Sequence, residues 1–110
     1  MLKYILLYLI VPNVALEGTA FQSSTYNKLG FAENAIDGST AVNFMRKSCT
    51  HTDLELNPWW TVDLKAEFNV SSISVTNRED CCANRLNGAE IRIGNSLERG
   101  GSTNPRYPLV

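Results

Sequence analysis

The sequence predicts one small all-β domain of the sandwich type. Over several short stretches apolar residues alternate with polar ones, which is the period of a strand with one buried face. Polar loops separate these stretches, and hardly any segment has a helical period, a combination typical of β-sandwiches. With 110 residues the chain has room for at most one domain and none for a second active module.

The first half of the chain predicts strands, one helical turn and a long loop. Residues 13–16 and 19–23 are β-compatible pieces that we interpret as edge strands. Residues 30–38 place Ala, Glu and Ile between two glycines and predict a single helical turn closed by Gly38. Residues 39–57 are polar and aperiodic, so we expect a long surface loop, a kind of segment that is usually functional or disordered in a small domain.

The second half predicts three more strands. Residues 59–64 and 72–76 both have the alternating pattern, and so do residues 89–93. Residues 77–88 form a loop that ends in the turn-forming pair Asn87-Gly88. Because these strands are too few to close two sheets, we expect the sequence to be a fragment of one domain that is incomplete at its C-terminus.

Composition excludes several classes of partner. The formal net charge is −1 and the sequence pI is about 5.7, with scattered basic residues, so neither nucleic acid nor an anionic membrane is expected to bind. Residues 1–12 contain Lys3 followed by an apolar run that is far short of the roughly 20 residues of a membrane span. We interpret them as a secretory signal peptide, which predicts an extracellular protein without membrane insertion. A wrongly assigned start of the chain is the alternative.

Residues 78–85 contain an unusually high proportion of charged residues and cysteines, namely Arg78, Glu79, Asp80, Cys81, Cys82 and Arg85. A guanidinium presents planar donors that suit vicinal hydroxyls or a carboxylate, and a nearby aspartate can hold it in place. Two such groups beside an apolar disulfide would form a pocket for a small molecule that is polar on one edge and apolar on the other. A deoxy sugar has that character.

The three cysteines leave two pairings open. Neighbouring Cα atoms lie about 3.8 Å apart, below the usual range for a disulfide, so Cys81 and Cys82 could be linked only in a strained ring. Strain of that kind tends to mark functional sites. The alternative pairs Cys49 with one of the two and leaves the other free.

The spacing of the single histidine His51, then Arg78-x-Asp80, then Arg85, resembles the fucose-binding signature of the F-type lectins. The similarity covers most of the chain from residue 13 onward, and it is carried further by residues 34–38, 48–51, 59–60 and 87–94. It implies a jelly-roll β-sandwich of the galactose-binding-domain type over residues 13–110. It also implies a secreted, calcium-dependent lectin that recognises terminal L-fucose on glycans and serves in innate immune recognition.

The resemblance assigns roles by position. His51, Arg78 and Arg85 would hydrogen-bond the fucose hydroxyls and ring oxygen, and Asp80 would orient an arginine. The apolar patch against the sugar's methyl group would consist of Phe44, Met45 and the vicinal Cys81–Cys82 disulfide. The family often has an aromatic residue where Met45 stands, so the fit there is expected to differ.

The resemblance also implies a structural calcium ion, a further disulfide and an assembly. Calcium takes six to eight oxygens, and the residues that match the family's ligands are Asn34, Asp37, Ser39 and Ser48. Cys49 would bond to a cysteine beyond Val110. Family members are oligomers or tandem repeats, so several sites acting together on fucosylated glycoproteins are expected.

Other functions fit the sequence less well. A zinc site made of Cys49, His51, Cys81 and Cys82 would lack the usual spacers between ligands. No Gly-x-Ser-x-Gly elbow predicts a hydrolase, and the adjacent carboxylates Glu79 and Asp80 do not suit a glycosidase, so no enzyme is expected. The main rival is an extracellular β-sandwich that serves in protein interaction, with a weakened or incomplete sugar site.

Overall fold

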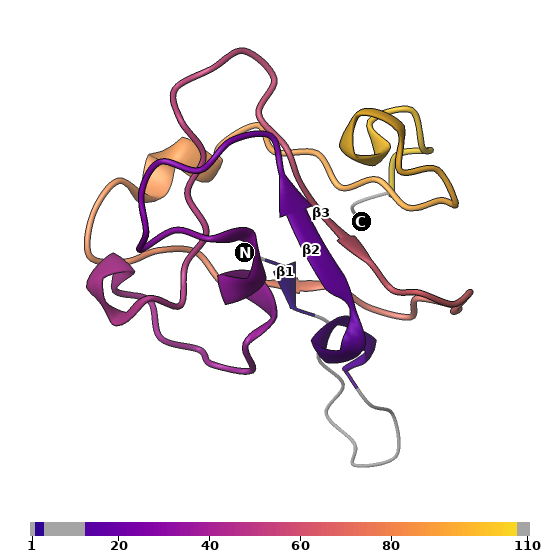
Figure 1. The fold of residues 1–110 in the computed structure, drawn as a ribbon, viewed down its shortest axis with the longest axis horizontal. Coiled ribbons are helices and arrows are strands. Elements are labelled where there is room, and N and C mark those ends of the chain that lie inside the picture. Colours follow the sequence, from indigo (N-terminus) through magenta and orange to yellow (C-terminus); the bar gives the residue numbers. More distant parts are fainter. Residues whose placement is uncertain (1, 4–12, 108–110) are drawn as a thin grey trace.

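The computed structural model describes residues 2–3 and 13–107, and Figure 1 shows their arrangement. The predicted signal peptide falls mostly on residues outside this part of the chain. The described elements are four strands and five 3₁₀ helices: β1 (Leu2–Lys3), η1 (Val14–Glu17), β2 (Thr19–Gln22), η2 (Ala32–Ile36), η3 (Phe44–Arg46), β3 (Trp60–Asp63), β4 (Ser74–Val75), η4 (Ala83–Leu86) and η5 (Glu98–Gly101). No helix in the described ranges has the length and apolar character needed to cross a membrane.

Two antiparallel strand pairs form the sheet structure. β2 pairs with β3 in a register that runs from Thr19 opposite Asp63 to Gln22 opposite Trp60, and the two strands lie side by side in the middle of Figure 1. β1 pairs with β4. The predicted strands at 19–23, 59–64 and 72–76 are therefore confirmed, each in a shorter form, and alternation was the correct signal for the last two.

The predicted edge strand at residues 13–16 is wrong, because this segment forms the 3₁₀ helix η1. The side chain of Asn13 accepts a hydrogen bond from the backbone N–H of Ala15 at 3.2 Å, and the N–H of Gly18 closes the turn on the Ala15 carbonyl at 3.0 Å. An asparagine offers the backbone this local partner in place of a strand neighbour, so a helical turn wins over the β-compatible side chains that follow.

The predicted strand at residues 89–93 is reduced to a single bridge between Arg92 and Arg106. Two backbone bonds flank it, from the Ile93 N–H to the Pro105 carbonyl and from the Tyr107 N–H to the Ile91 carbonyl. The facing segment contains a proline, which has no N–H to give to a ladder. In residues 2–3 and 13–107 no other strand pairs with this segment, and the alternating pattern therefore yields only a bridge.

The predicted surface loop at residues 39–57 contains much of the core. It holds η3 and the buried residues Phe44, Ser48 and Cys49, which join buried alanines from η1 and η2. The indole Nε1 of Trp60 donates to the Ala32 carbonyl at 2.8 Å and so connects β3 to this region. The polar composition of this segment predicted a surface loop. The segment can nevertheless pack against the core, because turns and side-chain hydrogen bonds satisfy its polar groups.

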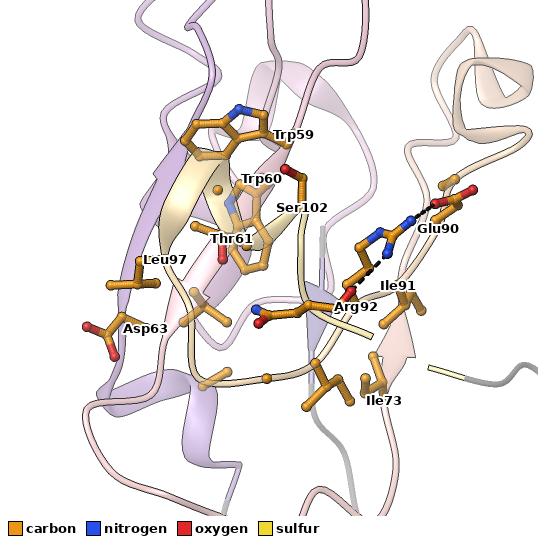
Figure 2. A pocket seen from close by; sticks show the side chains of 18 of the residues that line it. Trp59, Trp60, Thr61, Asp63, Ile73, Glu90, Ile91, Arg92, Leu97 and Ser102 are labelled. Atoms are coloured by element: carbon orange, nitrogen blue, oxygen red, sulfur yellow. Dashed lines mark hydrogen bonds and ion pairs between the residues drawn. The ribbon is translucent and has the colours of Figure 1, made fainter. Parts of the chain in front are cut away.

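A broad open cleft of about 2220 Å³ lies between β3 and the segment after η4. Figure 2 shows the indoles of Trp59 and Trp60 near one end of this cleft, with Ile73 and Ile91 across from them. Of the predicted sugar ligands, only Arg85 reaches its lining. The predicted site therefore lies at the loops beyond the cleft.

Candidate functional site

An arginine–aspartate pair forms the centre of the candidate site. Arg78 donates from Nε and Nη2 to the two carboxylate oxygens of Asp80, both at 2.8 Å, and Asp80 Oδ1 also accepts the backbone N–H of Phe44 at 3.0 Å. The paired guanidinium holds the pKa of Asp80 at about 2, and the carboxylate raises the pKa of Arg78. A fork held on two oxygens has little freedom left, so its remaining donors have a fixed direction.

The ring of Phe44 contacts both Arg78 and His51. The guanidinium carbon of Arg78 lies 4.6 Å from the ring centroid, and the imidazole of His51 lies 5.2 Å from it on a tilted plane. Such a cation–π contact keeps the guanidinium flat against the aromatic face. The backbone N–H of Glu79 also donates to the Val42 carbonyl at 2.9 Å, so the loops of Phe44 and Arg78 are joined side by side.

His51 faces Arg85 with a defined tautomer. Its Nδ1 lies 2.7 Å from the Thr52 carbonyl, which can only accept, so the proton sits on Nδ1. Nε2 then carries the lone pair and accepts from Arg85 Nη1 at 3.3 Å. The two residues come from loops far apart in sequence, and together they present one acceptor and several guanidinium donors at one place.

Two residues that the sequence did not single out hold His51 in position. The ring of Tyr26 lies 4.6 Å from the imidazole at an interplanar angle of 30°, and the Tyr26 N–H donates to the His51 carbonyl at 2.9 Å. The His51 N–H donates to the Gly30 carbonyl at 3.0 Å, and a Cβ at Gly30 would lie only 2.6 Å from the His51 Cβ. Nothing in the sequence pattern indicated a role for Tyr26. The need for a glycine at position 30 also appears only in the folded structure, where the backbone of this residue lies against His51.

The vicinal disulfide turns the chain toward Arg85. Cys81 and Cys82 are bonded to each other with their Cα atoms 3.7 Å apart, and Cys82 has a left-handed backbone (φ 62°) as it begins η4, which contains Arg85. The Asn77 amide braces the helix by donating to the Ala83 carbonyl at 2.8 Å. The vicinal link is therefore formed, and the alternative pairing of Cys49 with one of these cysteines is wrong.

Cys49 is a buried free thiol among the described residues, and its burial raises its pKa. The expectation that it bonds to a cysteine beyond Val110 stays a prediction. Met45 lies next to Phe44 at the surface with 68% of its area exposed. The apolar residues assigned to the sugar's methyl group thus comprise the buried ring of Phe44, the exposed thioether of Met45 and the Cys81–Cys82 disulfide.

Three of the four predicted calcium ligands lie together. Asp37 accepts from the Ser39 N–H at 2.8 Å and from the buried Ser48 hydroxyl at 2.6 Å. Asn34 turns its amide nitrogen to the Leu29 and Cys49 carbonyls, at 2.9 and 3.1 Å, so its own oxygens are the atoms that could face a cation. An all-oxygen set with one carboxylate and several neutral donors suits a hard cation such as calcium.

A zinc site is not formed. Within the ranges that the structure describes, no three His, Cys, Asp or Glu side chains are placed to share a metal ion. Cys81 and Cys82 are also committed to each other and have no thiolate to offer. The zinc alternative is therefore wrong for this part of the chain.

The arrangement is suited to recognition of a small neutral polar molecule. It combines fixed guanidinium donors, one imidazole acceptor and an apolar ring and disulfide alongside. The fold defines the class of protein, a domain with the galactose-binding-like fold. A family model described as NedA-like, galactose-binding domain matches residues 34–108. The chain belongs to this family and, within it, to the F-type lectins.

Several known proteins are similar to the chain. It is 48% identical over 98 residues to a pentraxin fusion protein of Xenopus laevis, covering 89% of the chain and 24% of that protein. It is 47% identical over 105 residues to fucolectin-4 of Anguilla japonica (92% of the chain, 58% of that protein) and 43% identical over 102 residues to the fucolectin of Anguilla anguilla (89% and 65%). The chain therefore spans less than two thirds of these relatives.

A solved structure supports the fold directly. The chain superposes on an F-lectin (fucolectin) from striped bass (Morone saxatilis) serum with a TM-score of 0.84 and 54% sequence identity, covering 86% of this chain and 33% of that one. The predicted fold class, a galactose-binding-like β-sandwich, is confirmed by this likeness.

Proposed function

We propose that the chain is a secreted lectin domain that binds terminal L-fucose through His51, Arg78 and Arg85. The observation that carries the proposal is the convergence of these three side chains, from two distant loops, beside Phe44 and the cysteine ring. Asp80 acts by holding the Arg78 fork. The relatives named fucolectins support fucose as the sugar.

The ligand's chemistry follows from what the site offers. Arg78 and Arg85 donate hydrogen bonds to hydroxyl oxygens, and the Nε2 lone pair of His51 accepts a hydrogen bond from a sugar hydroxyl once the sugar displaces the contact with Arg85. The disulfide and Met45 give the 6-deoxy methyl group an apolar neighbour. A sugar with a hydroxymethyl group there would bury a hydroxyl without a partner, which costs about 1 to 3 kcal/mol.

Calorimetric titration of the full chain with L-fucose tests the proposal. Arg85→Ala is expected to weaken L-fucose binding at least about tenfold, because a hydrogen bond from a charged donor contributes about 1.5 to 3 kcal/mol. Arg106→Ala is the matched control, since the partner of its exposed guanidinium among the described residues is Glu90, which is not assigned to the site. Undiminished binding by Arg85→Ala would refute the assignment.

We further propose that calcium binds at Asp37, Ser39 and Ser48, with a backbone or amide oxygen of Asn34. When bound, the ion holds the turn that precedes the His51 loop. Because most of these oxygens are neutral, millimolar calcium is expected to raise the thermal midpoint, and a chelator to lower it again. Asp37→Asn should abolish the calcium-dependent shift, and an identical shift in that variant would contradict the assignment.

Two further parts of the proposal concern the setting of the domain. We infer secretion from the apolar leader expected at residues 1–12 and from the serum origin of the striped bass F-lectin. We infer a role in innate recognition of fucosylated microbial glycans, through oligomers or repeats that add weak sites together. Size-exclusion chromatography with light scattering tests for the oligomer.

The proposed lectin binds its sugar without changing it, and this distinguishes it from an enzyme. The lectin relatives favour recognition alone, and turnover of a fucosyl glycoside by the chain would revive the enzyme hypothesis. An intact fold with no L-fucose binding in titration would instead favour the protein-interaction module.

A further inference from the structure

Two leucines in the loop before β3 are fully exposed. Leu54 has 105% of its reference area exposed and Leu56 has 94%, far more than most of the other large apolar side chains in the described ranges. This loop, between His51 and Trp59, projects from the end of the β2–β3 pair at the top of Figure 1. Single exposed leucines are common, but two fully exposed leucine side chains on one projecting loop need an explanation.

Two serines from the neighbouring loop fix the shape of this projecting loop. Ser24 Oγ accepts the Asp53 N–H at 2.8 Å at the start of the loop, and Ser23 Oγ accepts the Trp59 N–H at 3.1 Å at its end. The Ser23 N–H also donates to the Trp59 carbonyl at 3.0 Å. Both ends of the loop are therefore attached to one short segment.

The same serines hold the residue between the two leucines. Their hydroxyls donate hydrogen bonds to the Glu55 carboxylate, which lowers the pKa of Glu55. Each hydroxyl thus accepts one hydrogen bond from a loop end and donates one to the loop centre. Glu55 is half-buried and its two neighbours are exposed, so the loop places its charge inward and its apolar side chains outward. Charged side chains usually face the solvent and leucines the interior, so this arrangement reverses the usual preference. Five polar contacts between the loop and residues 23–24 hold it in place.

The leucine tip, defined as Leu54 and Leu56, lies close along the chain to the candidate sugar site. Leu54 is three residues after His51, within about 11 Å of chain. The Tyr26 N–H, two residues past Ser24, donates to the His51 carbonyl, so the loop that clamps the tip also braces the histidine. A surface that presents fucose to the site would therefore meet the tip.

The shape of the leucine tip favours a lipid surface over a protein as its partner. A narrow convex tip is buried by a protein only if the partner has a matching pocket, whereas lipid chains close around any protruding apolar group. Asp53 is exposed beside the tip and the chain's net charge is −1, which favours zwitterionic over anionic lipid. We propose that Leu54 and Leu56 insert into the zwitterionic lipid surface from which fucosylated glycolipid head groups project, in contrast to the expectation from the sequence that the protein inserts into no membrane. This rests on the proposed fucose site for its recruitment.

Vesicle binding tests the proposal. The full chain is titrated with phosphatidylcholine vesicles that contain a fucosylated glycolipid, and the combined Leu54→Ser and Leu56→Ser variant is expected to bind them at least about tenfold more weakly. Leu97→Ser is the matched control, because Leu97 is 52% exposed and lies at the cleft in Figure 2. Equal binding by the double variant and the parent, or an equal loss in the control, overturns the proposal.

Two further measurements separate the tip from the sugar site. Free L-fucose titration reports the site alone, and the double leucine variant should match the parent there. Leu56→Trp, on plain brominated phosphatidylcholine vesicles at high lipid concentration, reports the tip alone: its added emission should be quenched, unlike that of Leu97→Trp. Absent quenching overturns the proposal, even if L-fucose binds. So does loss of binding by the double variant to a fucosylated glycoprotein without lipid, which would identify a protein partner.

Discussion

The loops that carry the candidate site and the segment after η4 are held in different ways. The site loops are joined to one another by short bonds, such as Arg78 to Asp80, Asp80 to Phe44 and Gly30 to His51. Residues 88–107 are joined to one another by one β-bridge and exposed ion pairs, they contact the rest of the fold through η5 against β3 and through Asn95 to Glu67, and they border the open cleft of Figure 2. The comparison teaches that the site's geometry depends mainly on contacts among its own loops. Substitutions at the two ends should therefore differ in effect.

The largest effect is expected for Asp80→Ala. This change removes the partner of both Arg78 nitrogens and the acceptor of the Phe44 N–H, so L-fucose affinity should fall at least about a hundredfold. Calorimetric titration measures it. Glu79→Ala is the control, because only the backbone of Glu79 joins the loops. An L-fucose affinity of Asp80→Ala within about threefold of the parent would show that the Arg78 guanidinium does not need Asp80 to hold it in place.

A paired glycine substitution compares the two ends directly. Gly30→Ala should lower the free energy of unfolding by about 1 to 3 kcal/mol and also weaken L-fucose binding, because the new Cβ forces His51 to move. Gly88→Ala meets no atom within 4 Å and should cost only the strain of its positive φ, about 1 to 2 kcal/mol. Urea unfolding and titration measure both. Weakened sugar binding in Gly88→Ala alone would reverse the comparison.

Acid should affect the site loops through Asp80. Its pKa is about 2 in the folded chain and about 3.9 when unfolded, so the carboxylate's contribution to stability is complete above about pH 5 and is lost as the pH falls toward 2. Chemical unfolding at several pH values should show this loss in the parent. The slope should be reduced in Asp80→Asn, and an unchanged slope would mean that another carboxylate governs acid unfolding.

The smallest effect is expected for Glu90→Gln. Glu90 pairs with Arg92 and Arg106 at the rim of the cleft, where all three side chains are solvated. Exposed ion pairs contribute little, so L-fucose affinity should stay within about twofold of the parent. A marked loss of sugar binding would show that the cleft and the site are coupled.

The sequence predicted the parts of the molecule whose signals are local. Alternation located two of the strands, and the run from Arg78 to Arg85 contained both the fork and its aspartate. The convergence with His51 came from a family resemblance, since no periodicity relates residues so far apart. The sugar and calcium roles of these residues stay predictions that the experiments above address.

The parts that could not be predicted depend on contacts across the fold. The side chain of Asn13 converts an expected strand into a 3₁₀ helix, and Pro105 limits residues 89–93 to one bridge. Tyr26 and Gly30 matter only because the fold brings them against His51. Likewise, Glu55 reads as an ordinary surface acid until Ser23 and Ser24 are seen to bind it.

The pairing of Arg78 with Asp80 has an electrical consequence. The two formal charges cancel within the site, and the lone pair of His51 points at the one guanidinium that is left. Recognition of an uncharged sugar here should therefore change little with ionic strength. An acidic sugar would instead be attracted by the Arg85 guanidinium, so its binding should weaken as the ionic strength rises.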